Sequence, residues 1–431
     1  MSIRLRSDMR VRVQSLALFT SVAVLPLGIV HAQASPPTTA ASVQPVAVAP
    51  APAPTPPVEP TIVPPPVWSV PDAEELLAYI QAIGAEGLDP RDYGPEGLVA
   101  AIRSGNAEQL SQVATDRFKR VSNDLALGHV RRADRQQWLI PDPDLDSNRQ
   151  DLLLRTALQQ SRVGDALRGL LPTHPQYAAL KNALAVTPKS ERAKIDRIRL
   201  NMDRWRWLPR DLGDRYIIVN VPAYTAALVE NGVTKSRHRA VAGATRTPTP
   251  QLMVTATGVI LNPWWEVPKS IEPDIRGKRG YVAVKNDKGE TIRWRQPPGP
   301  SNALGQIKFV MPNPEAIYLH DTNARGLFDT KARAYSYGCI RTEHIMQLAK
   351  ILLAEDGGEW TAEKVDAALA GKKPVQANFV KPLPVYIVYM SAAAHTDGRI
   401  IDYADIYKRD DKAIAALNDH QPASQSKVVA R

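Results

Sequence analysis

Residues 316–341 read AIYLHDTNARGLFDTKARAYSYGCIR, and this stretch contains the only cysteine of the 431-residue chain. An apolar and aromatic run that is typical of a β-strand ends at His320. Cys339 follows nineteen positions later, directly after Gly338. Helical patterning begins at about residue 342, so we expect Cys339 to stand where a helix begins, within reach of His320.

This placement would make Cys339 a nucleophile. Unpaired N–H groups and the dipole at a helix N-terminus favour thiolate, so we expect a lowered pKa for the thiol. The N–H groups from Tyr337 to Ile340 would stabilise the oxyanion that forms when the thiolate attacks an amide. Gly338 would let the substrate backbone approach closely. His320 would take the thiol proton and return it to the leaving amine.

Each of these features also has a structural interpretation. A Ser-x-Gly-Cys sequence is often a turn with a helix cap, and a histidine at the end of a strand is often structural. Arg341 could be a surface charge, and Tyr318 a strand aromatic. The group that orients His320 is left open between a backbone carbonyl and the segment Asp321–Thr322.

Residues 1–34 have the build of a secretory signal peptide. They combine a cationic start, an apolar run at 16–30 and the small-x-small sequence Ala32-Gln-Ala34. An uncleaved N-terminal anchor is the alternative. Residues 35–67 are rich in Pro and Ala, which predicts a semi-rigid linker. We therefore expect an exported protein.

Export makes an unpaired cysteine unusual, because cysteines in oxidising compartments usually form disulfides. The net charge of +10 suits an anionic polymer, and export argues against nucleic acid. The eight histidines show no metal-ligand spacing, so we expect neither a metal nor another cofactor.

The pattern predicts an α+β chain with an all-helical scaffold at 68–200 and a mainly β domain at 201–409. A β-hairpin is expected around Asn231-Gly232, because this dipeptide favours a tight turn between strands. Residues 272–300 look like a long loop inserted in the β domain. Residues 410–431 look like a flexible tail.

The histidine and the Ser-Tyr-Gly-Cys-Ile-Arg element resemble the signature of L,D-transpeptidases with a YkuD-type catalytic domain. The likeness covers roughly residues 70–410 and is closest to the larger, YcbB-like branch of that family. It includes the segments Met202–Pro209, Arg215–Pro222, Asn262–Pro268, Arg295–Gly299, Asn302–Gly305, Lys308–Phe309 and Leu383–Tyr386.

The resemblance implies a peptidoglycan enzyme that acts in the periplasm, at the cell wall, and forms 3→3 cross-links. Cys339 would attack a tetrapeptide stem, release D-alanine and hold a thioester, which the amine of a diaminopimelate on another stem would resolve. Arg341 would bind a stem carboxylate, Tyr318 would line the pocket, and Ser336 and Tyr337 would contact substrate. Residues 272–300 would form the cap over the site, and carbapenems would acylate the enzyme.

The chain also departs from the family pattern. Tyr337 stands where relatives often have His or Ser, and the peptidoglycan-binding module of larger relatives is missing. Glycan affinity would then come from the scaffold, the cap or a partner such as a wall-synthesis protein docked on the scaffold. Three alternatives remain: an L,D-carboxypeptidase, a transferase that anchors proteins to the wall, and a non-catalytic wall-binding scaffold.

Overall fold

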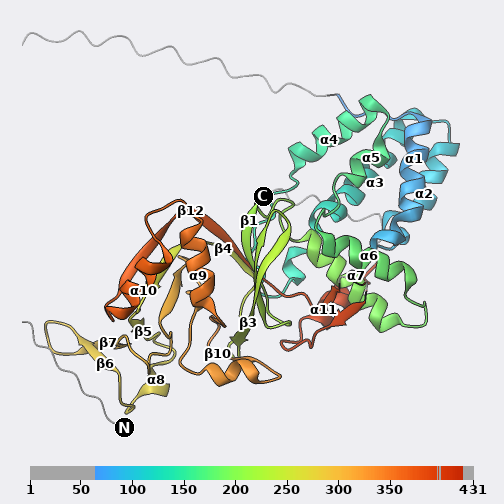
Figure 1. The fold of residues 1–431 in the computed structure, drawn as a ribbon. Coiled ribbons are helices and arrows are strands. Elements are labelled where there is room, and N and C mark those ends of the chain that lie inside the picture. The colour runs from blue at the N-terminus through green and yellow to red at the C-terminus, as the bar shows by residue number, and fades with distance from the viewer. Residues whose placement is uncertain (1–63, 396, 398, 421–431) are drawn as a thin grey trace, which may run out of the picture. The chain divides into compact units, whose positions relative to one another are not determined.

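The computed structural model describes residues 64–395, 397 and 399–420. The predicted signal peptide, most of the predicted linker and residues 421–431 lie outside this part of the chain. Figure 1 shows the helices of the N-terminal half beside a mainly β domain. The predicted α+β fold is therefore confirmed.

The scaffold is helical, as predicted. Its first helix begins at Ser69, whose side chain accepts the N–H of Asp72, and Pro71 occupies the first turn, where its missing N–H has no consequence. Leu76 and Ile80, one turn apart, are fully buried in the scaffold core. The helices are α1 (Val70–Ala82), α2 (Pro95–Arg103), α3 (Ala107–Leu127), α4 (Ser147–Gln160), α5 (Val163–Arg168), α6 (Pro175–Val186) and α7 (Arg192–Arg206).

Helix α7 links the two halves of the chain. The predicted border between residues 200 and 201 falls inside this helix. Ile198 and Trp205 of α7 share one apolar core with Tyr216 and Tyr386 of the β domain. The scaffold and the β domain therefore pack against each other through a continuous core at this point.

The β domain contains a nine-stranded sheet in the order β10-β3-β11-β9-β8-β4-β12-β1-β2, and β2 also pairs with β3, so the sheet closes on itself. The predicted hairpin is present. Asn231 (φ 48°) and Gly232 (φ 75°) lie between β2 and β3, where two positive φ angles suit a tight hairpin turn. The strands are β1 (Arg215–Asn220), β2 (Thr225–Glu230), β3 (Val233–Gly243), β4 (Leu252–Leu261), β8 (Ile307–Val310), β9 (Leu319–His320), β10 (Ala334–Ser336), β11 (Ile340–Thr342) and β12 (Val375–Val388).

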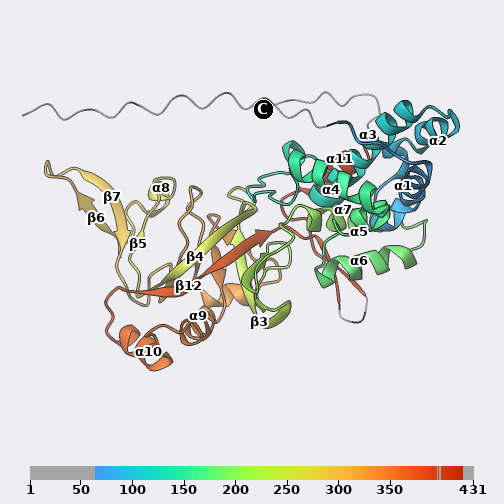
Figure 2. The same cartoon turned by 90° about the horizontal axis from the view of Figure 1, so that it is seen from above.

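The inner face of this sheet packs against helices α9 (Ile345–Ala354) and α10 (Ala362–Ala370), which lie beside β4 and β12 in both views (Figures 1 and 2). Ile307, Phe309, Leu319 and Ile340 belong to this buried core. Side chains alternate between the two faces of a strand. Lys308, His320 and Arg341 therefore face away from this core, whereas Tyr318 packs against its edge.

The prediction of a long loop at 272–300 is wrong, because most of this segment forms regular secondary structure. Helix α8 (Glu272–Ile275) is followed by β6 (Val282–Lys285) and β7 (Thr291–Gln296). With β5 (Trp265–Glu266) these strands form a small sheet in the order β5-β7-β6. An apolar cluster fixes it, formed by Trp265, Val267, Ile271, Ile275, Tyr281 and Trp294. We call residues 265–296 the cap.

The prediction of a flexible tail from residue 410 is also wrong for the first residues of that segment. They form helix α11 (Asp410–Leu417). Ala413 and Leu417 are buried in the same core as α7. Asp410 lies 2.8 Å from the guanidinium of Arg204, and both side chains are buried. This helix is fixed by packing against distant residues, which local composition does not reveal.

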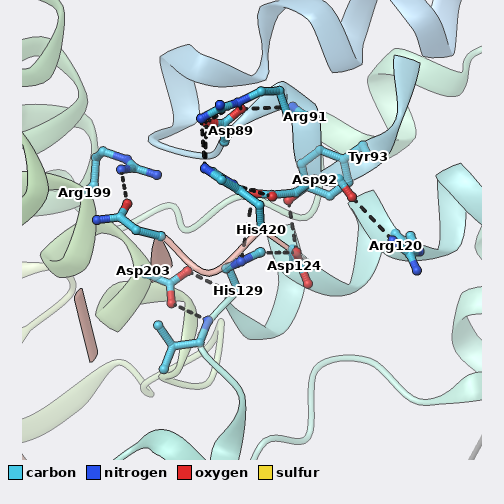
Figure 3. A network of polar contacts seen from close by, with 12 residues as sticks. Asp89, Arg91, Asp92, Tyr93, Arg120, Asp124, His129, Arg199, Asp203 and His420 are labelled. Carbon is cyan, nitrogen blue, oxygen red and sulfur yellow. Dashed lines mark hydrogen bonds and ion pairs between the residues drawn. The ribbon is translucent and has the colours of Figure 1, made fainter. Parts of the chain in front are cut away.

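Figure 3 shows a buried polar network that ties the scaffold to α7 and to the C-terminal segment. His129 Nδ1 lies 2.7 Å from Asp124 Oδ2, and His129 Nε2 lies 4.0 Å from Asp92. Asp203 of α7 accepts the backbone N–H of His129 at 2.8 Å. His420 Nδ1 lies 2.8 Å from Asp92 Oδ1. Four chain segments thus meet around one imidazole.

The network predicts a pH-dependent stability. Burial by itself lowers the pKa of His129, but the hydrogen bond and charge of Asp124 outweigh it, and the net pKa is raised. A raised folded-state pKa stabilises the fold below about pH 6.5, and this contribution is lost as the pH rises through the folded value. We expect Tm to fall between pH 6 and 9, and His129→Gln to remove part of that fall. Each unit of pKa shift corresponds to about 1.4 kcal/mol.

Thermal unfolding across pH checks this expectation. His344→Gln is the matched control, because the His344 side chain is 61% exposed. Equal pH dependence of Tm in the wild type and the His129 variant would contradict the assigned role.

Candidate active site

Cys339 lies in a tight turn between β10 and β11, so the prediction that it begins a helix is wrong. Residues 340–342 form a strand instead, in which Arg341 pairs with Val241 of β3 and with His320 of β9. Helix α9 starts only at Ile345, after His344 with its positive φ of 51°. The helix dipole therefore does not act directly on the thiol.

Hydrogen bonds inside the turn fix its shape. Ser336 Oγ donates to the carbonyl oxygen of Cys339 at 2.5 Å and accepts the N–H of Gly338 at 3.1 Å. Thr249 Oγ1 donates to the carbonyl of Gly338 at 2.7 Å. Gly338 has φ +116°, which side-chain-bearing residues rarely adopt. The buried Ser336, predicted to contact substrate, is thus engaged in holding the turn.

The register brings two of the predicted residues onto one face. Ile340 pairs with Leu319, and Arg341 pairs with His320, in parallel ladders between β11 and β9. Because Ile340 and Leu319 are buried in the core, their sequence neighbours face the other way. The side chains of His320 and Arg341 therefore share the outer face of the sheet. The Cys339 thiol lies close to this row, because Tyr318, Lys308 and Arg341 all act on it.

His320 is held by its own neighbour. Its Nδ1 lies 2.5 Å from the carbonyl oxygen of Asp321. A carbonyl only accepts, so Nδ1 carries the proton and Nε2 is left to accept one. The orienting group that the sequence left open is therefore the backbone carbonyl of Asp321.

The electrostatic surroundings keep the imidazole neutral. Burial, and then the positive charges of Arg341 and Lys308, lower the pKa of His320 to about 3, against the opposing bond to Asp321. A neutral imidazole at neutral pH is a base that is ready to accept a proton.

The thiol is also neutral at rest, so the predicted lowered pKa of Cys339 is wrong. Burial raises the pKa, and this outweighs hydrogen bonding from Tyr318 and the charges of Lys308 and Arg341. Sγ lies 3.5 Å from the carbonyl oxygen of Ala316, as expected of a thiol donor. Cys339 remains partly exposed, so a substrate can reach it.

Hydrogen bonds within the turn reduce the number of N–H groups that are available to bind an oxyanion. The N–H of Gly338 binds Ser336 Oγ, and the N–H of Ile340 binds the carbonyl of Tyr318 at 3.0 Å. The predicted role for Gly338 as a donor is therefore replaced by a role in shaping the turn. Within residues 337–340, the amides of Tyr337 and Cys339 are left for an oxyanion.

Lys308 is a site residue that the sequence did not single out. Its Nζ lies 3.9 Å from the centroid of the Tyr318 ring. It pairs with His320 across β8 and β9, and burial lowers its pKa. The signal was the alternation in β8, where Ile307 and Phe309 are buried and Lys308 faces outward.

Tyr337 links the catalytic turn to the cap. Its hydroxyl donates to Asp274 Oδ2 of α8, and the guanidinium of Arg246 lies 5.8 Å from its ring centroid. The ring is 40% exposed. The unusual tyrosine at this position thus holds the cap next to Cys339.

We expect Tyr337→Phe to loosen the cap with little effect on global stability, because one exposed hydrogen bond contributes only about 1 kcal/mol. Hydrogen exchange at residues 272–296 should quicken, while exchange in β4 and β12 should stay unchanged. Asp274→Asn is the matched variant, because an amide oxygen can still accept the bond. Unchanged cap protection in Tyr337→Phe would refute the link.

The described residues contain no group of three or more His, Cys, Asp or Glu side chains placed to hold a metal ion. Within the same residues, no helix has the length and apolar character needed to cross a membrane.

Two protein-family models match the chain, one in the β domain and one in the helical scaffold. Residues 214–376 match the model of the YkuD L,D-transpeptidase catalytic domain, and residues 64–184 match a scaffold domain. The β domain is a YkuD-type L,D-transpeptidase domain. Its matched range contains Cys339, His320 and every other residue of the site described above.

A protein of Haemophilus influenzae, provisionally named L,D-transpeptidase, is 31% identical over 283 residues. The match covers 59% of this chain and 57% of that protein, so the chain spans somewhat more than half the length of its relative.

Solved L,D-transpeptidases are more distant. The enzyme from Mycobacterium smegmatis is 11% identical, with a TM-score of 0.22 over 41% of this chain and 58% of its own. A mutant of the Enterococcus faecium L,D-transpeptidase is 13% identical, with a TM-score of 0.23 over 42% of this chain and 52% of its own. At such TM-scores we draw no geometric argument from them.

Proposed function

We propose that this protein is an exported peptidoglycan L,D-transpeptidase that forms 3→3 cross-links through a thioester on Cys339. The proposal rests on one place in a transpeptidase domain where Lys308 and Arg341 act on both a partly exposed thiol and a neutral buried imidazole. A nucleophile beside a base is the arrangement that acyl transfer needs.

In the first half-reaction, Sγ of Cys339 attacks the carbonyl before the terminal D-alanine of a tetrapeptide stem. A C–S bond forms, and Nε2 of His320 takes the thiol proton. The amides of Tyr337 and Cys339 stabilise the oxyanion. The C–N bond then breaks, the leaving amine takes the proton from His320, and D-alanine departs.

In the second half-reaction, the side-chain amine of a diaminopimelate on another stem attacks the thioester. The new C–N bond forms, the C–S bond breaks, and the amine proton returns through His320 to the sulfur. The enzyme is regenerated without any oxidation or reduction.

The surroundings of Arg341 suit a donor peptide that carries a carboxylate. Its guanidinium has a buried Nε without a hydrogen-bond partner, and burial lowers its pKa. A planar guanidinium can bind a carboxylate through two parallel hydrogen bonds. Tyr318, half-buried between Lys308 and His320, would line the donor pocket. Tyr337 would contact substrate from its position under the cap.

The wider context is part of the same proposal. The signal-peptide pattern and the Pro/Ala-rich linker support export to the periplasm and action at the cell wall. The helical scaffold would dock wall-synthesis proteins, and carbapenems would acylate Cys339.

Product analysis tests the proposal. The purified protein is incubated with disaccharide-tetrapeptide, and the products are identified by tandem mass spectrometry. We expect free D-alanine and 3→3 dimers. Tripeptide alone would indicate an L,D-carboxypeptidase, transfer to an added protein amine would indicate an anchoring enzyme, and no D-alanine release would indicate a non-catalytic scaffold.

A further inference from the structure

Two cations flank the catalytic histidine in one row across the sheet. Lys308 of β8 pairs with His320 of β9, and Arg341 of β11 pairs with the same His320. Neighbouring strands lie about 4.8 Å apart, so the backbones of the two cations stand about 10 Å apart with the imidazole between them. All three side chains face outward, and the charges of both cations act on the imidazole.

Neither cation forms an ion pair with an acid among the described residues. The acid that acts on Lys308 is Glu266 of the cap, and the Glu266 carboxylate lies 3.3 Å from the guanidinium of Arg293. The ammonium of Lys308 lies 3.9 Å from the centroid of the Tyr318 ring, a cation–π contact that leaves the charge without an anionic partner. Partly buried charges without a partner are unfavourable, so this row is suited to an anionic ligand.

With a neutral thiol and a neutral imidazole, the row has an excess of two positive charges. A ligand that carries two carboxylates would neutralise both. Arginine presents a planar fork that matches a fixed carboxylate, whereas lysine is a point charge on a flexible stem that can follow a longer side chain. The two cations therefore differ in the kind of carboxylate that each accommodates best.

We propose that Lys308 determines donor specificity by binding a free side-chain carboxylate on the residue before the scissile bond, while Arg341 binds the terminal carboxylate. This inference rests on the proposed function and specifies its donor. The preferred substrate is a peptide whose penultimate residue is a diamino dicarboxylic acid with an unmodified side-chain carboxylate. A stem in which that carboxylate is amidated, or in which lysine replaces the residue, is a poor donor.

The test compares two tetrapeptides that differ only in a free or an amidated side-chain carboxylate. The rate of terminal D-alanine release gives kcat/KM for each with the full chain. We expect the wild type to prefer the free carboxylate by about tenfold or more, as expected for a charge-assisted contact. Lys308→Met should slow both donors, because it removes a positive charge that acts on the Cys339 thiol. It should slow the free-carboxylate donor more, which reduces the preference to about twofold. Lys308→Arg should restore part of it.

Lys189→Met is the matched control, because Lys189 is exposed in the scaffold turn between α6 and α7. Its preference should equal that of the wild type. An equal slowing of both donors by Lys308→Met, or a wild type without preference, would overturn the role of Lys308 while leaving the transpeptidase proposal intact. If the wild type releases D-alanine from neither donor, the proposed function fails and this inference fails with it.

Discussion

Cys339→Ala is expected to abolish the release of D-alanine from a tetrapeptide donor, with a loss of about 10⁴-fold or more. Cys339 is the only cysteine of the chain, and its thiol is partly exposed, so no second thiol can replace it. The side chain is partly exposed and small, so its truncation should change the free energy of unfolding by less than about 1 kcal/mol. Steady-state D-alanine release, with thermal unfolding of the same preparation, measures both effects.

Ser336→Ala provides a contrast in the same turn. It removes the hydroxyl that bridges Gly338 and the Cys339 carbonyl. It should lower both activity and Tm, because it leaves the turn without its internal support. A Cys339→Ala protein that kept more than a hundredth of wild-type activity would show that the nucleophile lies elsewhere.

His320→Ala is expected to slow acylation by about 10² to 10⁴-fold, the range that a positioned general base supplies. The pH dependence of acylation also tests the protonation state of His320. The pKa of His320 is lowered to about 3, so the imidazole stays unprotonated as the pH falls from 7 to 5. A histidine with an ordinary pKa near 6.5 would lose its function as a base across that interval.

We therefore expect kcat/KM for acylation to stay nearly constant from pH 7 to about pH 4.5 in the wild type. His344→Ala, which truncates an exposed imidazole, should leave both rate and pH profile unchanged. A wild-type rate that fell tenfold for each pH unit below 6.5 would place the base at an ordinary pKa and contradict the burial argument.

Local signals in the sequence were sufficient for much of the fold. The sequence predicted the helical scaffold at 68–200 and the hairpin at Asn231-Gly232, because helical periodicity and turn residues act over a few neighbouring residues. The motif also predicts that His320 acts together with Cys339. The register of β9 and β11 places His320 beside Arg341, two residues after Cys339.

The errors arose where distant contacts decide the structure. Residues 340–342 form a strand because β3 and β9 lie on either side of them, and neither partner is evident from the local sequence. The helix at Asp410–Leu417 is held by the α7 core, and the cap by a small aromatic cluster. Cys339 precedes the strand β11 and not a helix. No helix N-terminus therefore stabilises its thiolate, and the thiol is neutral at rest.

This change alters how the nucleophile is activated. The resting site does not contain a thiolate–imidazolium ion pair. Instead, Lys308 and Arg341 lower the free energy of the thiolate and the oxyanion only as these charges develop, while His320 accepts the proton. Preorganised positive charge is most effective in a partly desolvated site such as this one.

In the proposed reaction, Cys339 becomes acylated by the stem peptide as D-alanine leaves. Intact-protein mass spectrometry, with peptide mapping of protein quenched in acid during turnover, tests it directly. We predict a mass increase equal to the donor minus D-alanine, located on the peptide that contains Cys339 and missing in Cys339→Ala. Release of D-alanine with no adduct on Cys339, or with an adduct on another residue, would contradict the account.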